Sequence, residues 1–235
     1  MVRTAIARRF GIGVVDQILS SLTNFAVTFA VARSAGTRGL GVFGLAFAMY
    51  TIALGISRAI NTEPMVVRHS TTSTADWRAA AADATGSALT LGVFAGVCSL
   101  VAALTFDGIA GRVFLVLAIG FPFLLLQDSW RWAFVAKARP GLAAINDLLW
   151  AIVMLPLVTL LLATDRATIT NVTLVWVGGA AVAAIGGIVQ SHVRPRPGRL
   201  PAWWRENSDL GPRYVIEGLA GGFNVELAVF ATGAI

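Results

Sequence analysis

The chain has 235 residues, of which 57% are hydrophobic and only 13% are charged, and its mean hydropathy is +0.76. A soluble domain carries about a quarter charged residues, so this composition excludes an ordinary soluble protein and favours one that lies in lipid. The formal net charge of +6 is spread over short segments between apolar runs, without blocks of bases interleaved with aromatic residues, which argues against nucleic acid as a partner.

Six apolar runs are long enough to cross the hydrocarbon core, which takes about 20 helical residues for roughly 30 Å, and a seventh begins near the end of the sequence. None shows the alternating polarity of membrane β-strands, so we expect an all-α integral membrane protein. In chain order the runs cover 11–33, 41–60, 79–105, 112–136, 142–163, 169–191 and 210–235.

The only long polar connection, at 192–209, divides the chain into a six-helix transmembrane lobe at 1–191 and a helix at 210–235. Prolines in this basic linker disfavour a continuous helix, and we expect Trp203 and Trp204 to lie at the level of the lipid headgroups. The last run has no polar exit loop, so we expect a piece of a longer transporter. The alternative is a complete protein whose last helix ends at the outer surface.

The distribution of bases predicts a cytoplasmic N-terminus. With that orientation, all but four of the 18 Lys and Arg residues fall on the inner side; the four outside are Arg33, Arg38, Arg112 and Arg166. The first run also resembles a signal peptide, but its polar residues and its length make cleavage the weaker interpretation.

The stretch "ISRAINTEPMVVRHS" ends the second run with charged side chains beside a proline. Because the residue before a proline disfavours helix, we expect the helix to end at Glu63. Arg58 lies about one turn before that end and Arg68 lies in the loop beyond it. We therefore predict an Arg58–Glu63 clamp that closes the inner end of the bundle. The simpler alternative is a helix end whose charged side chains lie at the cytoplasmic membrane interface.

Polar residues inside the spans are the candidate site residues, since a charge at the centre of a spanning helix costs about 2.5–3.5 kcal/mol and normally faces protein or water. Asp16, Ser20 and Asn24 recur every four residues and so share one helix face, and Glu217 and Asn224 share another. We expect them to line a substrate cavity. The competing interpretation is that polar groups near the inner interface cap helices or pair with loop arginines.

Three further sequence features bear on chemistry. Asp128 and Arg131, three residues apart near a helix end, predict a local ion pair. Cys98 is the only cysteine and lies in an apolar run, where we expect a small buried side chain. His69 and His192 have no metal-ligand spacing, so we expect neither a metal site nor a cofactor.

The segment from Asp16 to Ser70 resembles the opening of Wzx-type oligosaccharide flippases, within the multidrug/oligosaccharidyl-lipid/polysaccharide exporter superfamily. The resemblance is carried by Asp16-Gln17, Ser20, Ser21, Asn24, "VAR" with a polar turn, Gly41, Phe43, Arg58, Glu63-Pro64 and Arg68. It implies a MATE-like transporter of two six-helix lobes around a central cavity, of which this chain holds the N-terminal lobe and the start of a seventh helix.

The resemblance further implies alternating access that carries an undecaprenyl-diphosphate-linked glycan from the cytoplasmic to the outer leaflet of a bacterial inner membrane. Expected partners are this lipid-linked glycan, membrane lipids, and a glycan polymerase or glycosyltransferases. Basic residues at the inner mouth, with Arg58 and Arg68 as candidates, suit a diphosphate. The alternatives are a multidrug/cation antiporter of the same superfamily, a membrane-embedded enzyme of glycan assembly, and a non-transporting scaffold.

Overall fold

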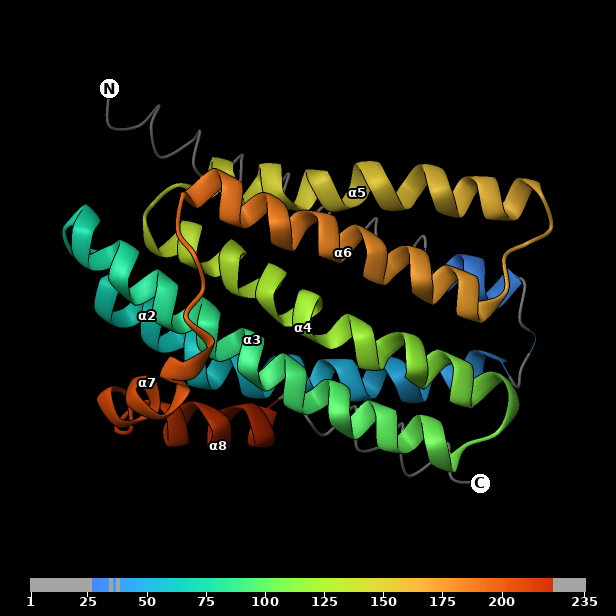
Figure 1. Cartoon of the computed structure of the whole chain (residues 1–235), viewed down its shortest axis with the longest axis horizontal. Helices are drawn as coiled ribbons and strands as arrows, with labels where there is room; N and C mark the ends of the chain where they lie inside the picture. Colours follow the sequence, from blue (N-terminus) through green and yellow to red (C-terminus); the bar gives the residue numbers. More distant parts are fainter. Residues whose placement is uncertain (1–26, 34–35, 37–38, 222–235) are drawn as a thin grey trace.

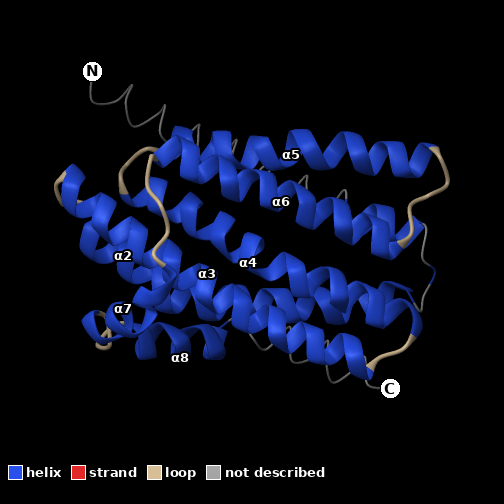
Figure 2. Cartoon of the chain, viewed as in Figure 1, coloured by secondary structure: helices blue, strands red, loops and turns tan. Residues whose placement is uncertain are grey.

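Figure 1 shows the computed structural model of the chain, which describes residues 27–33, 36 and 39–221. This described part contains helices and no strand (Figure 2), which confirms the all-α class. Five of its helices are long and apolar enough to cross a membrane: Gly39–His69, Thr74–Thr105, Gly108–Ala136, Pro140–Ala163 and Ile169–Ser191. Of the first predicted helix only 27–33 is described, and these residues are helical.

The spanning helices α3 (Thr74–Thr105), α4 (Gly108–Ala136), α5 (Pro140–Ala163) and α6 (Ile169–Ser191) end where the apolar runs end. Three of the four begin a few residues before the apolar run, in the polar loops. The Ser73 side chain accepts a hydrogen bond from the Asp76 backbone N–H at the start of α3. Pro140 opens α5, where its missing N–H costs nothing.

The second spanning helix does not end at Glu63, so that prediction is wrong. The helix widens into a π-helical turn, η1 (Arg58–Thr62), and continues as α2 (Glu63–His69). Pro64 cannot give an N–H to the Ile60 carbonyl four residues earlier. That carbonyl instead accepts a hydrogen bond of 2.9 Å from the Trp203 indole, so the helix passes the proline without leaving this acceptor empty.

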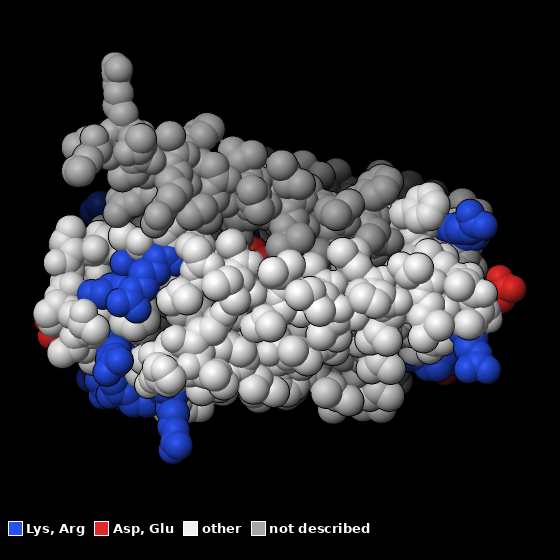
Figure 3. Space-filling model, turned by 90° about the horizontal axis from the view of Figure 1, so that it is seen from above, with Lys and Arg blue, Asp and Glu red and all other residues white. Residues whose placement is uncertain are grey.

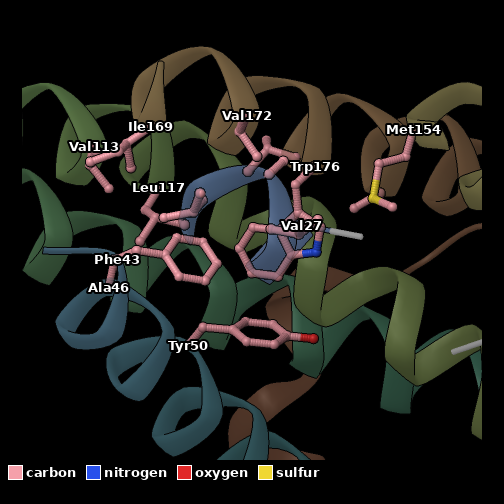
Figure 4. Packing of buried hydrophobic residues seen from close by; sticks show 14 of the residues in the cluster. Val27, Phe43, Ala46, Tyr50, Val113, Leu117, Met154, Ile169, Val172 and Trp176 are labelled. Atoms are coloured by element: carbon pink, nitrogen blue, oxygen red, sulfur yellow. The ribbon is translucent and has the colours of Figure 1, made fainter. Parts of the chain in front are cut away.

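Close packing of α3 on α4, and of α4 and α5 on α6, builds the bundle (Figure 1). Small residues make the approach possible: an added Cβ at Gly92 would overlap the α4 backbone at Pro122, and one at Gly187 would overlap the Trp130 ring. Figure 4 shows the larger of two buried apolar clusters, in which the Tyr50 ring meets the Trp176 ring edge-on at 4.9 Å. These contacts hold the helices against one another where lipid supplies no hydrophobic drive.

The basic linker after α6 is folded onto the bundle. It contains a 3-10 turn, η2 (Pro197–Arg199), and a short helix, α7 (Leu200–Glu206), and is followed by α8 (Gly211–Gly221). Arg196 donates its backbone N–H to the Ala82 carbonyl of α3 at 2.8 Å, and it passes so close to Gly86 that a Cβ there would overlap its backbone. The linker is therefore fixed to α3 by its backbone as well as by its charges.

The two linker tryptophans differ in exposure. Trp204 is 37% exposed, whereas Trp203 is 2% exposed and packs in the second apolar cluster. Trp203 is therefore not an exposed interfacial aromatic, because its indole N–H donates to the Ile60 carbonyl, while the headgroup level of both tryptophans stays a prediction. Figure 3 shows Lys and Arg gathered at the two ends of the molecule, with a largely uncharged middle, as membrane embedding requires.

Candidate functional site

A polar network crosses the interior of the bundle. Its first part is an ion pair between Arg58, in η1, and Asp128, in α4: the guanidinium donates two hydrogen bonds, from Nη2 to Oδ1 at 2.6 Å and from Nε to Oδ2 at 3.0 Å. The Asp128 side chain is 7% exposed. The Arg58 guanidinium also lies 5.7 Å from the centre of the Trp132 ring, within cation–π range. Arg58 is thus held by α4 from two sides.

This geometry corrects the predicted Arg58–Glu63 clamp, because the partner of Arg58 is Asp128. Glu63 follows Arg58 by one turn of the π-helix, but the Arg58 guanidinium donates two hydrogen bonds to Asp128 on α4. Glu63 makes no ion pair within the described part of the chain and is partly exposed. The ion pair of Arg58 therefore joins two different helices and does not link two turns of the same helix.

The second part of the network joins α4 to α5. Arg131 Nε lies 3.2 Å from Asp147 Oδ2, and both side chains are largely buried. The predicted local pair Asp128–Arg131 is therefore wrong: each member has its partner on another helix. Inside a bundle such a cross-helix pair is preferable, since it neutralises two desolvated charges at a helix–helix contact.

Buried amides extend the network to α6. Gln127 Nε2 donates to Asp147 Oδ1 at 2.8 Å and to Asn146 Oδ1 at 3.3 Å. Asn146 Nδ2 in turn donates to the Ala183 carbonyl at 2.7 Å and to Gln190 Oε1 at 3.1 Å. Three spanning helices, α4, α5 and α6, therefore meet in one hydrogen-bonded cluster. The Arg58–Asp128 pair adds the second spanning helix through a separate contact on α4, and together these contacts specify the register of the helices.

The sequence places Gln127, Asn146 and Asp147 inside the apolar runs but gives no indication that they contact one another. No spacing signal could have given one, because the partners lie on α4, α5 and α6. The usable signal was the energetic cost of a polar side chain within the membrane. This cost implies that each side chain has a hydrogen-bond or ion-pair partner but does not identify that partner.

The remaining predicted site residues fall into two groups. Asp16, Ser20, Asn24 and Asn224 lie outside the described residues. Arg68 is exposed and pairs with Asp209, the last residue of the linker, at 2.6 Å. Glu217 is exposed on α8, near enough to Glu63 for the two carboxylates to repel one another. Their place on a substrate cavity stays a prediction.

Other chemistry has little support in the described residues. They contain no group of three His, Cys, Asp or Glu side chains that could hold a metal ion. His69 stacks on Trp203 with ring centres 6.1 Å apart, and its Nδ1 has no hydrogen-bond partner. His192 ends α6 in a left-handed conformation. Cys98 is exposed on α3, so the expectation that it is buried is wrong.

No family model and no curated protein matches this chain. Two solved structures have its fold, each with a TM-score of 0.58, 16% sequence identity, and coverage of 92% of this chain and 52% of the other. One is a MOP superfamily transporter from Pyrococcus furiosus, described as having a binding pocket of reversed polarity. The other is a multidrug resistance MATE family transporter of the MOP superfamily in an outward-facing conformation.

The likeness establishes the MATE-like membrane fold, in agreement with the fold class expected from the sequence. The chain spans about half the length of these two transporters. At this identity the likeness extends to the fold and not to the substrate.

Proposed function

We propose that this chain forms the N-terminal lobe of a membrane transporter that carries a lipid-linked oligosaccharide from the cytoplasmic to the outer leaflet by alternating access. The multi-pass helical bundle and its fold support a transporter. The resemblance of 16–70 to Wzx-type flippases supports the glycan substrate and a bacterial inner membrane. In such a cell the glycosyltransferases and polymerase of glycan assembly would be its partners.

The observation that carries the choice of substrate is the pairing of buried carboxylates with arginines. Among the described residues of the spanning helices, Asp128 pairs with Arg58, Asp147 with Arg131, and Asp83 with both Arg196 and Arg199. A carboxylate bound to a guanidinium cannot take up a proton or a cation without first losing its partner. The interior therefore presents amides and neutralised pairs, which suit a polyhydroxylated, anionic ligand.

A multidrug or cation antiporter is the second candidate, because one of the structural neighbours is a multidrug transporter. In that case Asp128 or Asp147 would exchange its arginine for the cation during transport. A glycan-assembly enzyme finds less support, since neither histidine is paired with an acid that would tune it for proton transfer.

The two transport functions can be separated by ligand-dependent thermal stability of the purified full chain in lipid nanodiscs. The probes are undecaprenyl-diphosphate-linked N-acetylglucosamine, undecaprenyl monophosphate and the organic cation tetraphenylphosphonium. We expect the linked sugar to raise the Tm most, since ligand that binds the folded state stabilises it by mass action. Stabilisation by the organic cation alone would favour the antiporter, and transfer of the sugar to an acceptor would favour an enzyme.

A further inference from the structure

A small basic pocket lies at the end of the bundle that we place at the cytoplasmic surface. Its volume is about 60 Å³, and it is lined by the start of α3, the α4–α5 turn and the end of α6. Its polar lining consists of Thr74, Arg78, Lys137, Arg139, Gln190 and Ser191. In Figure 1 these three segments meet at one end of the molecule. The pocket is separate from the Arg58–Asp128 pair.

Three cations converge on this pocket from two segments that are distant in sequence. Trp77 donates its indole N–H to the Ala133 carbonyl at 3.0 Å, which fixes the start of α3 against the end of α4 and brings Arg78 beside Lys137. The turn after α4 then supplies Arg139. None of the described residues that line the pocket is acidic. Arg78 and Arg139 are exposed and Lys137 is half-buried, so an anion that enters the pocket meets three cations and no acidic residue in the described lining.

Two side chains of the pocket also have hydrogen-bond donors without an acceptor in the described residues. Gln190 is oriented by Asn146, whose Nδ2 donates to Gln190 Oε1 at 3.1 Å. Its Nε2 is buried and has no hydrogen-bond partner. Lys137 Nζ uses one donor on the Thr72 carbonyl at 3.2 Å, and an ammonium group has three. Because buried donors are usually hydrogen-bonded, the Gln190 amide is a candidate donor to an oxygen-rich ligand.

From the convergence of Arg78, Lys137 and Arg139 with the unpartnered Gln190 amide, we infer that this pocket binds a phosphate group. Arginine suits a phosphate because its planar fork matches two oxygens, and lysine adds a mobile point charge. The volume of about 60 Å³ is far below that of a pocket for a drug-sized ligand, so the pocket suits a small group such as a single phosphate. This inference goes beyond the proposed transport function and does not depend on it.

The phosphate group has two possible sources, the headgroup of an anionic phospholipid in the inner leaflet and free inorganic phosphate. Native mass spectrometry of the full chain, released from nanodiscs of phosphatidylcholine with phosphatidylglycerol, measures retained lipid. Titration of the detergent-purified chain with inorganic phosphate measures the free ion. Neither assay contains lipid-linked glycan, so its failure is distinguishable from failure of the proposed transport.

The variant R78Q/K137Q/R139Q removes the three charges of the pocket. The control variant R194Q/R205Q/R213Q removes three exposed arginines of the linker region, so it changes the net charge equally. We expect the pocket variant to lose phosphatidylglycerol or phosphate binding by about tenfold or more, since charge-assisted hydrogen bonds are lost, and the control variant to retain it. Binding in the lipid assay alone identifies the headgroup, and binding of the free ion identifies inorganic phosphate.

A second variant, Gln190→Glu, guards against misfolding of the triple variant. It keeps the oxygen that accepts from Asn146 and places a negative charge where the unpartnered amide lies. We expect it to weaken phosphate binding while the Tm of the ligand-free chain stays close to that of the wild type. Equal losses in the pocket and control variants, unaltered binding in Gln190→Glu, or no binding by the wild type in either assay would overturn the inference.

Discussion

The indole nitrogen of Trp203 lies 2.9 Å from the carbonyl oxygen of Ile60, although the two residues are 143 positions apart. That carbonyl is the one to which Pro64 cannot donate, because proline has no N–H. The linker therefore completes the hydrogen bonding of a spanning helix. This relationship explains how an apolar run with a proline near its end continues as helix to His69.

Trp203→Phe is expected to lower the free energy of unfolding by about 1–3 kcal/mol, because the partly buried Ile60 carbonyl then loses its indole donor. Trp204→Phe is the matched control, since Trp204 is far more exposed, and its effect should be small. Unfolding in sodium dodecyl sulfate measures both. If the two variants are equally stable, the indole–carbonyl bond does not support the helix.

Pro64→Ala restores the missing N–H and provides a further control. In the Pro64→Ala background, Trp203→Phe should cost less than in the wild type, because the Ile60 carbonyl can then bond within its own helix. Strictly additive losses would contradict this coupling.

The Arg58–Asp128 pair predicts a second difference. Asp128→Asn leaves a guanidinium without its counter-charge and is expected to destabilise the chain by about 1–3 kcal/mol, discounted because the Arg58 side chain is one-third exposed. Glu63→Gln removes a carboxylate from the helix that carries Arg58, and since Glu63 makes no ion pair within the described residues, the change should cost much less. The reverse order of effects would restore the Arg58–Glu63 clamp.

Gly86→Ala tests the docking of the linker on α3. A Cβ at this position would overlap the Arg196 backbone, so the linker must move away. Trypsin should then cut faster after Arg199, which η2 holds against Asp83. Gly178→Ala is the control, because no atom lies within 4 Å of its added Cβ, and it should leave the cleavage rate unchanged. Unchanged cleavage in Gly86→Ala would mean that the linker is not fixed at this crossing.

The orientation in the membrane predicts a third kind of result. With Cys98 replaced by alanine, a cysteine at Thr71, between α2 and α3, should be protected in intact cells from a membrane-impermeant thiol reagent. A cysteine at Asp165, between α5 and α6, should react, since the two loops lie at opposite ends of the helices. The opposite pattern of labelling would invert the topology derived from the charge distribution.

Hydropathy predicted the spanning helices well, and α3, α4, α5 and α6 end at the predicted residues. Length and apolar composition determine these limits almost alone, because the hydrocarbon thickness is fixed. The failure at Glu63 arose from a local rule about proline, which a tertiary contact from Trp203 overrides. Local rules cannot include a donor that arrives from another part of the chain.

The same limit of local sequence rules applies to the residues of the candidate site. Arg58, Asp128 and Arg131 could be selected from the sequence because ionisable side chains are costly within a membrane and therefore mark structural or functional contacts. Their partners could not be predicted in this way. Two residues spaced i, i+3 can pair along one helix, but each can also pair with another helix, and only the packing of the helices decides between these contacts. The Gln127–Asn146–Gln190 amides belong to the same class, because each has its partner on a different helix.

The account depends on the claim that arginines neutralise the interior carboxylates, so that the lobe selects an anionic ligand. Equilibrium binding of the full chain in nanodiscs to undecaprenyl-diphosphate-linked N-acetylglucosamine and to tetraphenylphosphonium tests this most directly, in the wild type and in the variant R58Q/R131Q. We predict that the wild type prefers the linked sugar by about tenfold or more and that the variant, in which Asp128 and Asp147 lose these two arginines, shifts towards the cation. A wild type that prefers the organic cation would contradict the account.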